Sequence, residues 1–334
     1  AVQVGQSLVE AVSEFRFTWQ GHHFDIGVSV GVVPITGSSG DAVSVLSRAD
    51  LACYIAKDRG RGRVHVHSAE ERPREPSRDM PRAEGLREAL EQGRFCLYCQ
   101  PVVPLAGEPG RRPLHYELLL RLIDVDGRLV MPDEFMPAAE RHGLMAAIDR
   151  WVIAAALTRY DRLFRTSGVA INISASSVGG TGLVDYVRTL AGRSAMRPDQ
   201  VCFEVSERTA LTRLAAAAEL VSELKHDGYR VAIDDFGKGL GPHGYLRSLP
   251  VDYVKIDGGF VRDMAEDEAS RATVGAISQV GRLMGLSTIA EQVESTSAIP
   301  LLRELAVDYA QGLALGELIA VDELVTTHTI QLPN

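Results

Sequence analysis

A series of short apolar segments, each with a carboxylate, amide or ammonium side chain near its end, runs through most of the 334-residue sequence. In chain order these polar residues are Glu117, Asn172, Glu204, Asp234 with Asp235, Lys255, Glu291 and Gln311. Five of them are carboxylates, which would repel one another strongly in a shared pocket unless cations neutralise them. If the segments are parallel strands, the pattern predicts a divalent metal site.

The side chains that could bind the metal also indicate its kind. Apart from one lysine, the set offers only oxygen atoms, and it lacks the Cys and His ligands that zinc prefers, so we expect Mg²⁺ or Mn²⁺. Asp234 and Asp235 are adjacent, and adjacent side chains in a regular strand point to opposite faces. Both can reach one site only if the strand ends there, and the Phe-Gly-Lys-Gly segment that follows supplies such an end.

Each of these residues also has an ordinary structural explanation. A single Glu or Asn at the end of a strand is more often a helix cap or a loop contact than a ligand, and two Asp residues before a Gly turn can simply begin the turn. Lys255 could be a solvated lysine, but Val254 and Ile256 on either side are typical of a buried strand. Eight such positions on successive segments are much harder to explain in this way.

Strand and helix patterns alternate from residue 95 to the C-terminus, which predicts a parallel α/β sheet. The expected strands are 95–103, 116–123, 169–174, 201–205, 231–235, 251–256, 286–291 and 307–311. Eight strands favour a closed (β/α)8 barrel of the TIM type over an open sheet. Barrel enzymes carry their chemistry at the carboxyl ends of the strands, so residues far apart in the sequence would converge there.

A smaller region precedes the barrel. Residues 1–15 have a helical pattern, residues 24–33 alternate as a strand does, and residues 46–58 form another helical segment. Residues 67–81 are charged and Pro-rich without an apolar stripe, which is typical of a linker. We therefore divide the chain into an N-terminal region of residues 1–66, a linker of residues 67–81 and a barrel of residues 82–334.

Composition restricts the class of protein and its partners. The sequence is 46% hydrophobic and 24% charged, as globular proteins are, and no apolar run is long enough to cross a bilayer, so we expect no membrane contact within this sequence. A net charge of -9 disfavours general binding to DNA or RNA. The four cysteines are few and irregularly spaced, which favours a reducing cytoplasm, although an upstream segment could tether the protein to a membrane.

Taken together, residues 86–325 resemble the EAL-domain cyclic di-GMP phosphodiesterases. The resemblance is carried, in the family's order, by Gln-Pro at 100–101, Tyr-Glu-Leu-Leu-Leu-Arg at 116–121, Asn-Ile-Ser at 172–174, Phe-Glu-Val-Ser-Glu at 203–207, Ile-Asp-Asp-Phe-Gly at 233–237, Val-Asp-Tyr-Val-Lys-Ile-Asp at 251–257, Ala-Glu-Gln-Val-Glu at 290–294 and Asp-Tyr-Ala-Gln-Gly at 308–312. It implies a (β/α)8 barrel of the EAL type, whose first strand is antiparallel to the others. It also implies hydrolysis of cyclic di-GMP (c-di-GMP) to linear pGpG in bacterial second-messenger signalling.

The resemblance further implies a role for individual residues, with two Mg²⁺ or Mn²⁺ ions per site. The first ion would be held by Glu117, Asn172, Glu204 and Asp234. Asp234 would bridge to a second ion, held also by Asp235 and Glu291. Catalytic roles would fall to Lys255, Glu291, Gln311 and Glu207, with Lys255 and Gln311 positioning the attacking water. The substrate would be bound by Gln100, Arg121 and Glu294.

The N-terminal region resembles the C-terminal part of a GGDEF domain. The similarity lies in Ser-Val-Gly-Val at 29–32 and Ala-Asp-Leu-Ala-Cys-Tyr-Ile-Ala-Lys at 49–57. We expect a small α+β remnant there. Because the signature hairpin and the metal-binding carboxylates of the cyclase would lie before residue 1, we expect no diguanylate cyclase activity.

One loop departs from the EAL pattern. Where the family usually has Thr or Ala, Gly, an aromatic residue and two serines, this sequence has Lys-Gly-Leu-Gly-Pro at 238–242. Lys238 adds a cation beside the metal site, and Pro242 removes an amide donor. A second hypothesis is therefore a receptor that binds c-di-GMP with little or no turnover; the ordered motifs disfavour a third, an unrelated barrel enzyme. The family often forms dimers through this region, which makes a homodimer a further expectation.

Overall fold

The computed structural model describes residues 1–15, 17–19, 22–24, 27–36, 63–66, 83–106, 112–238 and 243–324, together with residues 45, 49, 52, 53 and 56. The chain divides into two compact units, Ala1–Met80 and Pro81–Asn334. The predicted linker of residues 67–81 lies outside the described residues, as do most residues of the predicted helix 46–58.

The smaller unit combines one helix with two pairs of short strands. The helix α1 (Val2–Glu14) was predicted; the strands are β1 (Phe17–Trp19), β2 (His22–Phe24), β3 (Val30–Val32) and β4 (Val64–Val66). β1 pairs with β2 antiparallel, and β3 pairs with β4 parallel. The predicted strand 24–33 is therefore too long, because its first residue ends β2 and only β3 pairs with β4. A Cβ at Gly31 would lie 2.5 Å from the backbone nitrogen of Cys53, so this close approach requires glycine.

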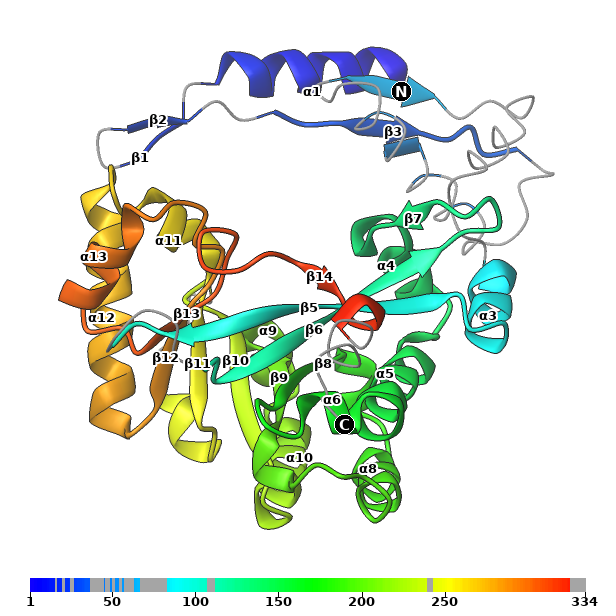
Figure 1. Cartoon of the computed structure of the whole chain (residues 1–334). Helices are drawn as coiled ribbons and strands as arrows, with labels where there is room; N and C mark the ends of the chain where they lie inside the picture. The colour runs from blue at the N-terminus through cyan, green and yellow to red at the C-terminus, as the bar shows by residue number, and fades with distance from the viewer. Residues whose placement is uncertain are drawn as a thin grey trace. The chain divides into compact units, whose positions relative to one another are not determined.

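Eight strands of the larger unit close into a barrel (Figure 1). They are β5 (Phe95–Pro104), β6 (His115–Ile123), β8 (Val169–Ile173), β9 (Val201–Ser206), β10 (Arg230–Phe236), β11 (Tyr253–Ile256), β12 (Ser287–Ala290) and β13 (Tyr309–Ala310). β5 is antiparallel to both of its neighbours, β6 and β13, and the other neighbouring pairs are parallel. The predicted eight-stranded barrel with an antiparallel first strand is confirmed.

Helices connect the strands and surround the barrel (Figure 1). They are α3 (Ala83–Glu91), α4 (Pro132–Arg141), α5 (Met145–Ala154), η1 (Ala155–Arg159), α6 (Asp161–Phe164), α7 (Ala175–Val178), α8 (Leu183–Ala191), η2 (Pro198–Gln200), α9 (Glu207–Thr212), α10 (Leu214–His226), η3 (His243–Ser248), α11 (Gly258–Asp263), α12 (Glu268–Met284) and α13 (Ala298–Glu304). Two short strands, β7 (Leu129–Val130) and β14 (Ile319–Ala320), extend the sheet from β6 and β5. Within the described ranges, no helix is both long and apolar enough to cross a membrane.

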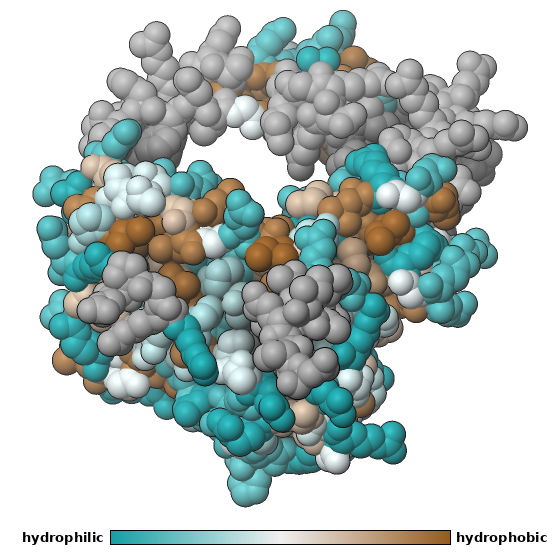
Figure 2. Space-filling model, in the orientation of Figure 1, coloured by the Kyte–Doolittle hydropathy of each residue, from teal (hydrophilic) through white to brown (hydrophobic). Residues whose placement is uncertain are grey.

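The core lies between the barrel and its helices. The largest fully buried side chains there include Phe135, Phe164, Phe203 and Phe236. Phe95 of β5 packs edge to face against Phe135 of α4, with ring centroids 5.7 Å apart. On the face shown in Figure 2, the surface over α8 and α10 is mostly hydrophilic, so these helices turn a polar side outward. The barrel is thus held from outside by packed aromatic and aliphatic residues, which leaves its interior for other side chains.

Candidate active site

The alternation of side chains along the strands builds the site. Every second residue of a strand faces the same side. On four neighbouring strands, one layer of residues forms a small separate cluster: Ala170, Cys202, Ala232 and Tyr253. Two residues further along the same strands stand four of the predicted site residues: Asn172, Glu204, Asp234 and Lys255. The spacing in the sequence therefore places these polar side chains together, one level nearer the carboxyl ends of the strands.

The amine of Lys255 is the centre of this group. The side chain is fully buried, and its Nζ lies close to carboxylate oxygens from four separate parts of the chain: Glu117 (3.1 Å), Glu204 (2.7 Å), Asp234 (3.1 Å) and Glu291 (2.9 Å). Three of these carboxylates belong to β6, β9 and β10, and the fourth directly follows β12. We call Lys255 with these four carboxylates the Lys255 cluster.

Two amide side chains complete the hydrogen bonds of Glu117. Asn172 Nδ2 donates to Glu117 Oε1 at 2.7 Å, and Gln311 Nε2 donates to Glu117 Oε2 at 2.8 Å. The same Gln311 nitrogen lies 3.2 Å from Gln100 Oε1, and Gln100 Nε2 donates to the carbonyl of Gly316. The antiparallel strand β5 thus contributes Gln100 to the edge of the cluster, as its pairing with Glu117 in the register of β5 and β6 requires.

The charges in the cluster influence one another strongly. Burial alone would lower the pKa of Lys255, but the surrounding carboxylates, Asp234 foremost, raise it well above its ordinary value. Burial raises the pKa of both Glu204 and Glu291 well above the ordinary range. For Glu117 burial acts in the same direction, but Lys255 and the two amide donors outweigh it and lower the pKa. One ammonium faces four carboxyl groups, and the raised pKa of two of them shows that their negative charge is unfavourable here unless a further cation is present.

The oxygen atoms of the cluster fit a hard divalent cation. Among the residues that the structure describes, buried Glu204 Oε1, Asp234 Oδ1 and Gln311 Oε1 have no hydrogen-bond partner, although Asp234 Oδ1 makes the ion-pair contact with Lys255. Carboxylate and amide oxygens are the ligands that Mg²⁺ and Mn²⁺ prefer. Within the described ranges, no three His, Cys, Asp or Glu side chains are already arranged around a common metal position. The amine of Lys255 lies between the carboxylates, so metal binding requires these side chains to adjust.

Asp235 pairs with another lysine, Lys238. Its backbone φ is 53°, and the pairing of β10 with β11 shifts register between Ile233 and Phe236. The amine of Lys238 lies 3.2 Å from Asp235 Oδ1 and 2.5 Å from Asp257 Oδ2. The prediction that the strand ends at Asp235 is wrong by one residue, since β10 continues to Phe236. A register shift, not the end of the strand, breaks the alternation of the two adjacent carboxylates.

Glu207 connects the two sides of the unusual loop. This carboxylate is 3% exposed; its Oε2 accepts a hydrogen bond from the amide of Gly237 at 3.1 Å, and its Oε1 accepts one from the hydroxyl of Tyr245 at 3.0 Å. Residues 239–242, and with them the predicted effect of Pro242, lie outside the described residues. Glu207 therefore holds the chain immediately before this segment and shortly after it.

Two predicted substrate-binding residues lie apart from the Lys255 cluster. Arg121 is 6% exposed, its Nη1 donates to the carbonyl of Leu120 at 2.7 Å, and its guanidinium lies 5.6 Å from the centre of the Tyr98 ring. Glu294 is exposed, and its Oε1 is 3.9 Å from the guanidinium of Arg262. Neither makes a hydrogen bond to the cluster among the residues that the structure describes.

Sequence reasoning gave no role to Asp257, although it ends one of the motifs. Its carboxylate is almost completely buried, with Oδ1 accepting from the amide of Gly259 at the start of α11 and Oδ2 facing Lys238. An Asp followed by two glycines at a helix start is a common capping signal. That signal accounts for one oxygen and gives no reason to expect the other to face a lysine.

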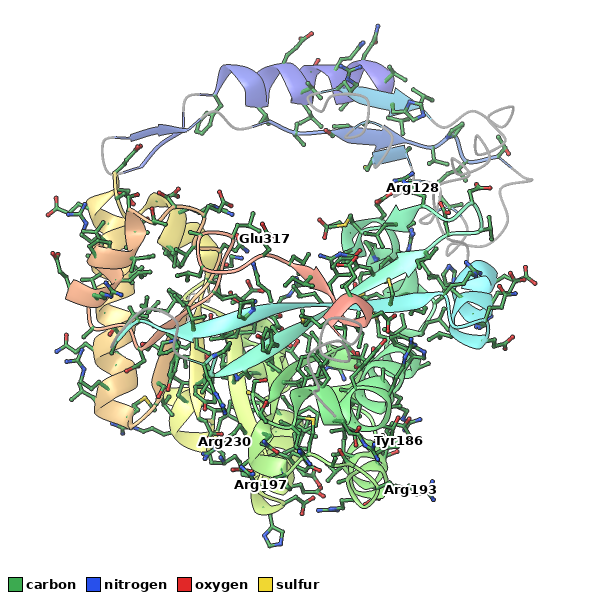
Figure 3. The ribbon with its side chains drawn as sticks, viewed as in Figure 1. Arg128, Tyr186, Arg193, Arg197, Arg230 and Glu317 are labelled. Atoms are coloured by element: carbon green, nitrogen blue, oxygen red, sulfur yellow. The ribbon has the colours of Figure 1, made fainter. Side chains whose placement is uncertain are left out.

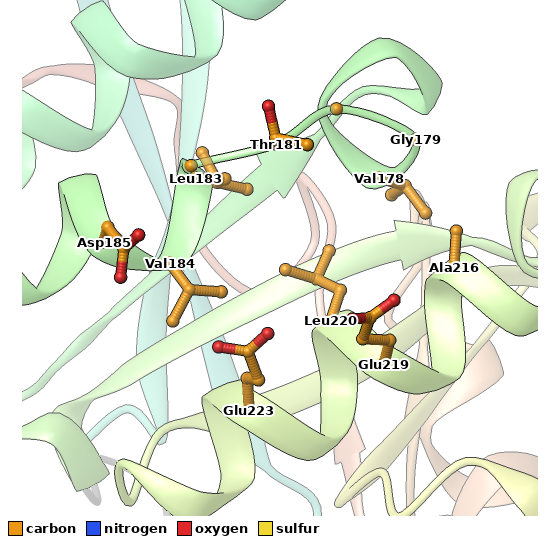
Figure 4. A pocket seen from close by; sticks show the side chains of 12 residues that line it. Val178, Gly179, Thr181, Leu183, Val184, Asp185, Ala216, Glu219, Leu220 and Glu223 are labelled. Atoms are coloured by element: carbon orange, nitrogen blue, oxygen red, sulfur yellow. The ribbon is translucent and has the colours of Figure 1, made fainter.

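A separate pocket of about 270 Å³ lies between α8 and α10 (Figure 4). Leu220 and Val184 form part of its apolar lining, and the carboxylates of Asp185, Glu219 and Glu223 stand around them. Arg188 pairs with two of these carboxylates, those of Asp185 and Glu223, at 3.3 Å each. The pocket contains none of the residues with predicted chemistry, so the Lys255 cluster is the candidate active site.

Comparison with known sequences agrees with this geometry. Residues 83–317 match the family described as EAL domain. The chain is 36% identical over 298 residues to the cyclic di-GMP phosphodiesterase PdeB of Shewanella oneidensis, which is 88% of this chain and 35% of that protein. It is 32% identical over 333 residues to MucR of Pseudomonas aeruginosa, a bifunctional diguanylate cyclase/cyclic di-GMP phosphodiesterase, covering 98% of this chain and 48% of that protein. The chain thus spans between a third and a half of the length of these relatives.

Solved structures give the same result. The c-di-GMP complex of the PaMucR phosphodiesterase is 33% identical with a TM-score of 0.67, covering 72% of this chain and 98% of that one. The FimX EAL domain of Pseudomonas aeruginosa bound to c-di-GMP is 30% identical with a TM-score of 0.64, covering 70% and 94%. With its barrel, its strand-end residues and more than two thirds of its length matching, this chain belongs to the EAL domain family.

Proposed function

We propose that this chain hydrolyses c-di-GMP to linear pGpG with two Mg²⁺ or Mn²⁺ ions. The observation that carries the proposal is the convergence of four carboxylates, from four separate parts of the barrel sequence, on one buried amine. The names of the relatives PdeB and MucR, both cyclic di-GMP phosphodiesterases, support the choice of substrate.

In this proposal, two ions share Asp234. Glu117, Asn172, Glu204 and Asp234 would hold the first, and Asp234, Asp235 and Glu291 the second. When bound, two such ions lower the pKa of a water molecule and neutralise charge on the attacking and leaving oxygens of an in-line displacement. Lys255 and Gln311, which both donate to Glu117, hold that carboxylate in place and would orient the attacking water.

Substrate binding would involve residues around the cluster. Arg121 has the planar guanidinium that suits a phosphate, and it stands four residues beyond Glu117 on the same face of β6. Gln100 contacts Gln311 and is held by the carbonyl of Gly316, so it would contact the substrate next to the water-orienting amide. Glu294 would act from the exposed rim.

The test is direct. The purified chain is incubated with c-di-GMP and either Mg²⁺ or Mn²⁺, and pGpG is followed by chromatography. We expect product from the wild type and none from an Asp234→Asn variant, which keeps the shape of the residue and removes the charge that both ions share. No product from the wild type with either ion would refute the proposal.

A receptor that binds c-di-GMP without hydrolysis is the second candidate function. It is favoured by the contact between Lys238 and Asp235, because that carboxylate would have to leave a lysine before it could bind a metal ion. Tight binding of c-di-GMP in a calorimeter, without pGpG at any concentration of divalent ion, would select this candidate.

For the smaller unit, we propose that it is the C-terminal part of a GGDEF domain. The alignment with MucR, a bifunctional cyclase and phosphodiesterase, extends over 98% of this chain and so includes this unit. We also propose that the chain forms a homodimer. A monomeric mass in light scattering at micromolar concentration would contradict this.

A further inference from the structure

The carboxylates of Asp235 and Asp257 share one cation, the amine of Lys238. The distances are 3.2 Å to Asp235 Oδ1 and 2.5 Å to Asp257 Oδ2. The side chain of Asp257 is only 5% exposed, so its charge is poorly hydrated, whereas the side chain of Lys238 is 60% exposed. A partly solvated lysine therefore neutralises a nearly buried carboxylate.

The backbone keeps Lys238 beside these carboxylates. Asp235 has a positive φ, and the amide of Gly237 is bound to Glu207, so the chain turns sharply immediately before Lys238. The lysine and Asp235 are three residues apart, and the turn brings their side chains together. Because Lys238 belongs to the chain, its amine stays beside Asp235 when divalent ions are removed.

A divalent ion at Asp235 must displace this lysine. Two cations at one carboxylate repel each other, so binding the ion requires the amine of Lys238 to move away. The amine itself returns to water, since the lysine side chain is exposed, but the nearly buried Asp257 loses its counter-charge, so the displacement has a cost. The lysine would accordingly weaken ion binding without preventing it.

We infer that Lys238 competes with the second divalent ion of this site and thereby sets the concentration of Mg²⁺ or Mn²⁺ at which the site becomes fully loaded. The inference rests on the proposed two-ion site and concerns its regulation. The chain should bind one ion readily and the second only at higher concentration. Lys238 would act indirectly, by occupying the carboxylate of Asp235.

Titration of the chelator-treated protein with Mn²⁺, followed by the electron paramagnetic resonance signal of free Mn²⁺, counts bound ions without reference to activity. The key variant is Lys238→Met, which removes the charge and keeps the length of the side chain. Lys238→Arg keeps the charge. Arg197→Met is the control for total charge. Arg197 is exposed, and it lies at the opposite end of the barrel from Glu317, the residue after the Gly316 that binds Gln100 (Figure 3).

We expect Lys238→Met to tighten the weaker Mn²⁺ site about fivefold, which corresponds to about 1 kcal/mol for an ion pair with one exposed partner. Lys238→Arg and Arg197→Met should leave both sites close to the wild type. The Mn²⁺ concentration that gives half of the maximal rate of pGpG formation should fall in parallel for Lys238→Met.

Unchanged or weaker Mn²⁺ binding by Lys238→Met would overturn the inference, and so would equal tightening by Arg197→Met. The two proposals fail separately. Tighter Mn²⁺ binding without pGpG from any protein would keep the competition and refute the phosphodiesterase. Production of pGpG by the wild type, with Mn²⁺ binding that does not respond to Lys238→Met, would do the reverse.

Discussion

Replacing Lys255 by Met should destabilise the metal-free protein by about 3 to 5 kcal/mol, the usual cost of removing one partner from a buried ion pair. The side chains of Lys255 and Glu204 expose no surface, and the amine lies within 3.1 Å of four carboxylates. Without the amine these carboxylates stay buried with no positive charge among them. Met has nearly the same length, so lost packing contributes little.

The same substitution at Lys225 provides the matched comparison. Lys225 Nζ contacts both oxygens of Asp252 at 2.7 Å, but its side chain is 25% exposed. Asp252 also accepts hydrogen bonds from Arg230 and from the amide of Val231, so it keeps partners when the lysine is lost. Lys225→Met should cost no more than about 1 kcal/mol, which leaves a difference of about 2 to 4 kcal/mol between the two variants.

Urea unfolding followed by circular dichroism, at neutral pH with a chelator and then with Mn²⁺, measures both effects. In the chelator the Lys255→Met protein should unfold at much lower urea than the Lys225→Met protein. Mn²⁺ should recover more stability in Lys255→Met than in the wild type, because the ion replaces the missing charge. Equal losses for the two variants, or no additional gain from Mn²⁺, would refute the view that Lys255 is the counter-charge of the cluster.

Three further predictions concern the loop, the core and the metal. Glu207→Gln should cost about 1 to 3 kcal/mol in urea unfolding, because the hydrogen bonds from Gly237 and Tyr245 then lose their charged acceptor; a loss no larger than that of Tyr245→Phe would contradict this. Phe135→Ala should lower the free energy of unfolding by about 3 to 5 kcal/mol while the folded protein keeps its rate of pGpG formation, so a proportionate loss of rate would show that the site depends on this packing. Chelation should stop pGpG formation and Mn²⁺ should restore it; product formed in excess chelator would exclude a metal-dependent reaction.

The barrel could be predicted because its strands are short apolar runs with polar ends. The predicted strand 251–256 begins two residues too early, and the reason is physical. Val251 is buried, as a strand residue would be, but its amide bonds to the carbonyl of Leu249 in a local turn. Burial can be inferred from residue type, whereas the hydrogen bonds that separate a strand from a buried turn depend on the fold.

The candidate site could be predicted as a set of residues but not as an arrangement. Positions near the carboxyl ends of the strands indicated that Glu204 and Lys255 converge, and the chemistry of the set predicted a cation, whereas Glu117 lies near the amino end of β6 and reaches the site from there. That the amine itself lies between the carboxylates could not be predicted, since this depends on the closure of the barrel. The contact of Lys238 with Asp257 could not be predicted either, because it depends on the positive φ of Asp235 and on the register shift between β10 and β11.

The reversed direction of β5 determines where the chain enters the barrel. Phe95, the first residue of β5, pairs with Leu122 near the carboxyl end of β6, so α3 joins the barrel at the end toward which the seven parallel strands run. If the first strand were parallel to the others, α3 would join the barrel at the opposite end. Any pull or rotation that travels along the polypeptide from residues before α3 therefore reaches the barrel at the rim of the site, next to the residues that would bind the substrate.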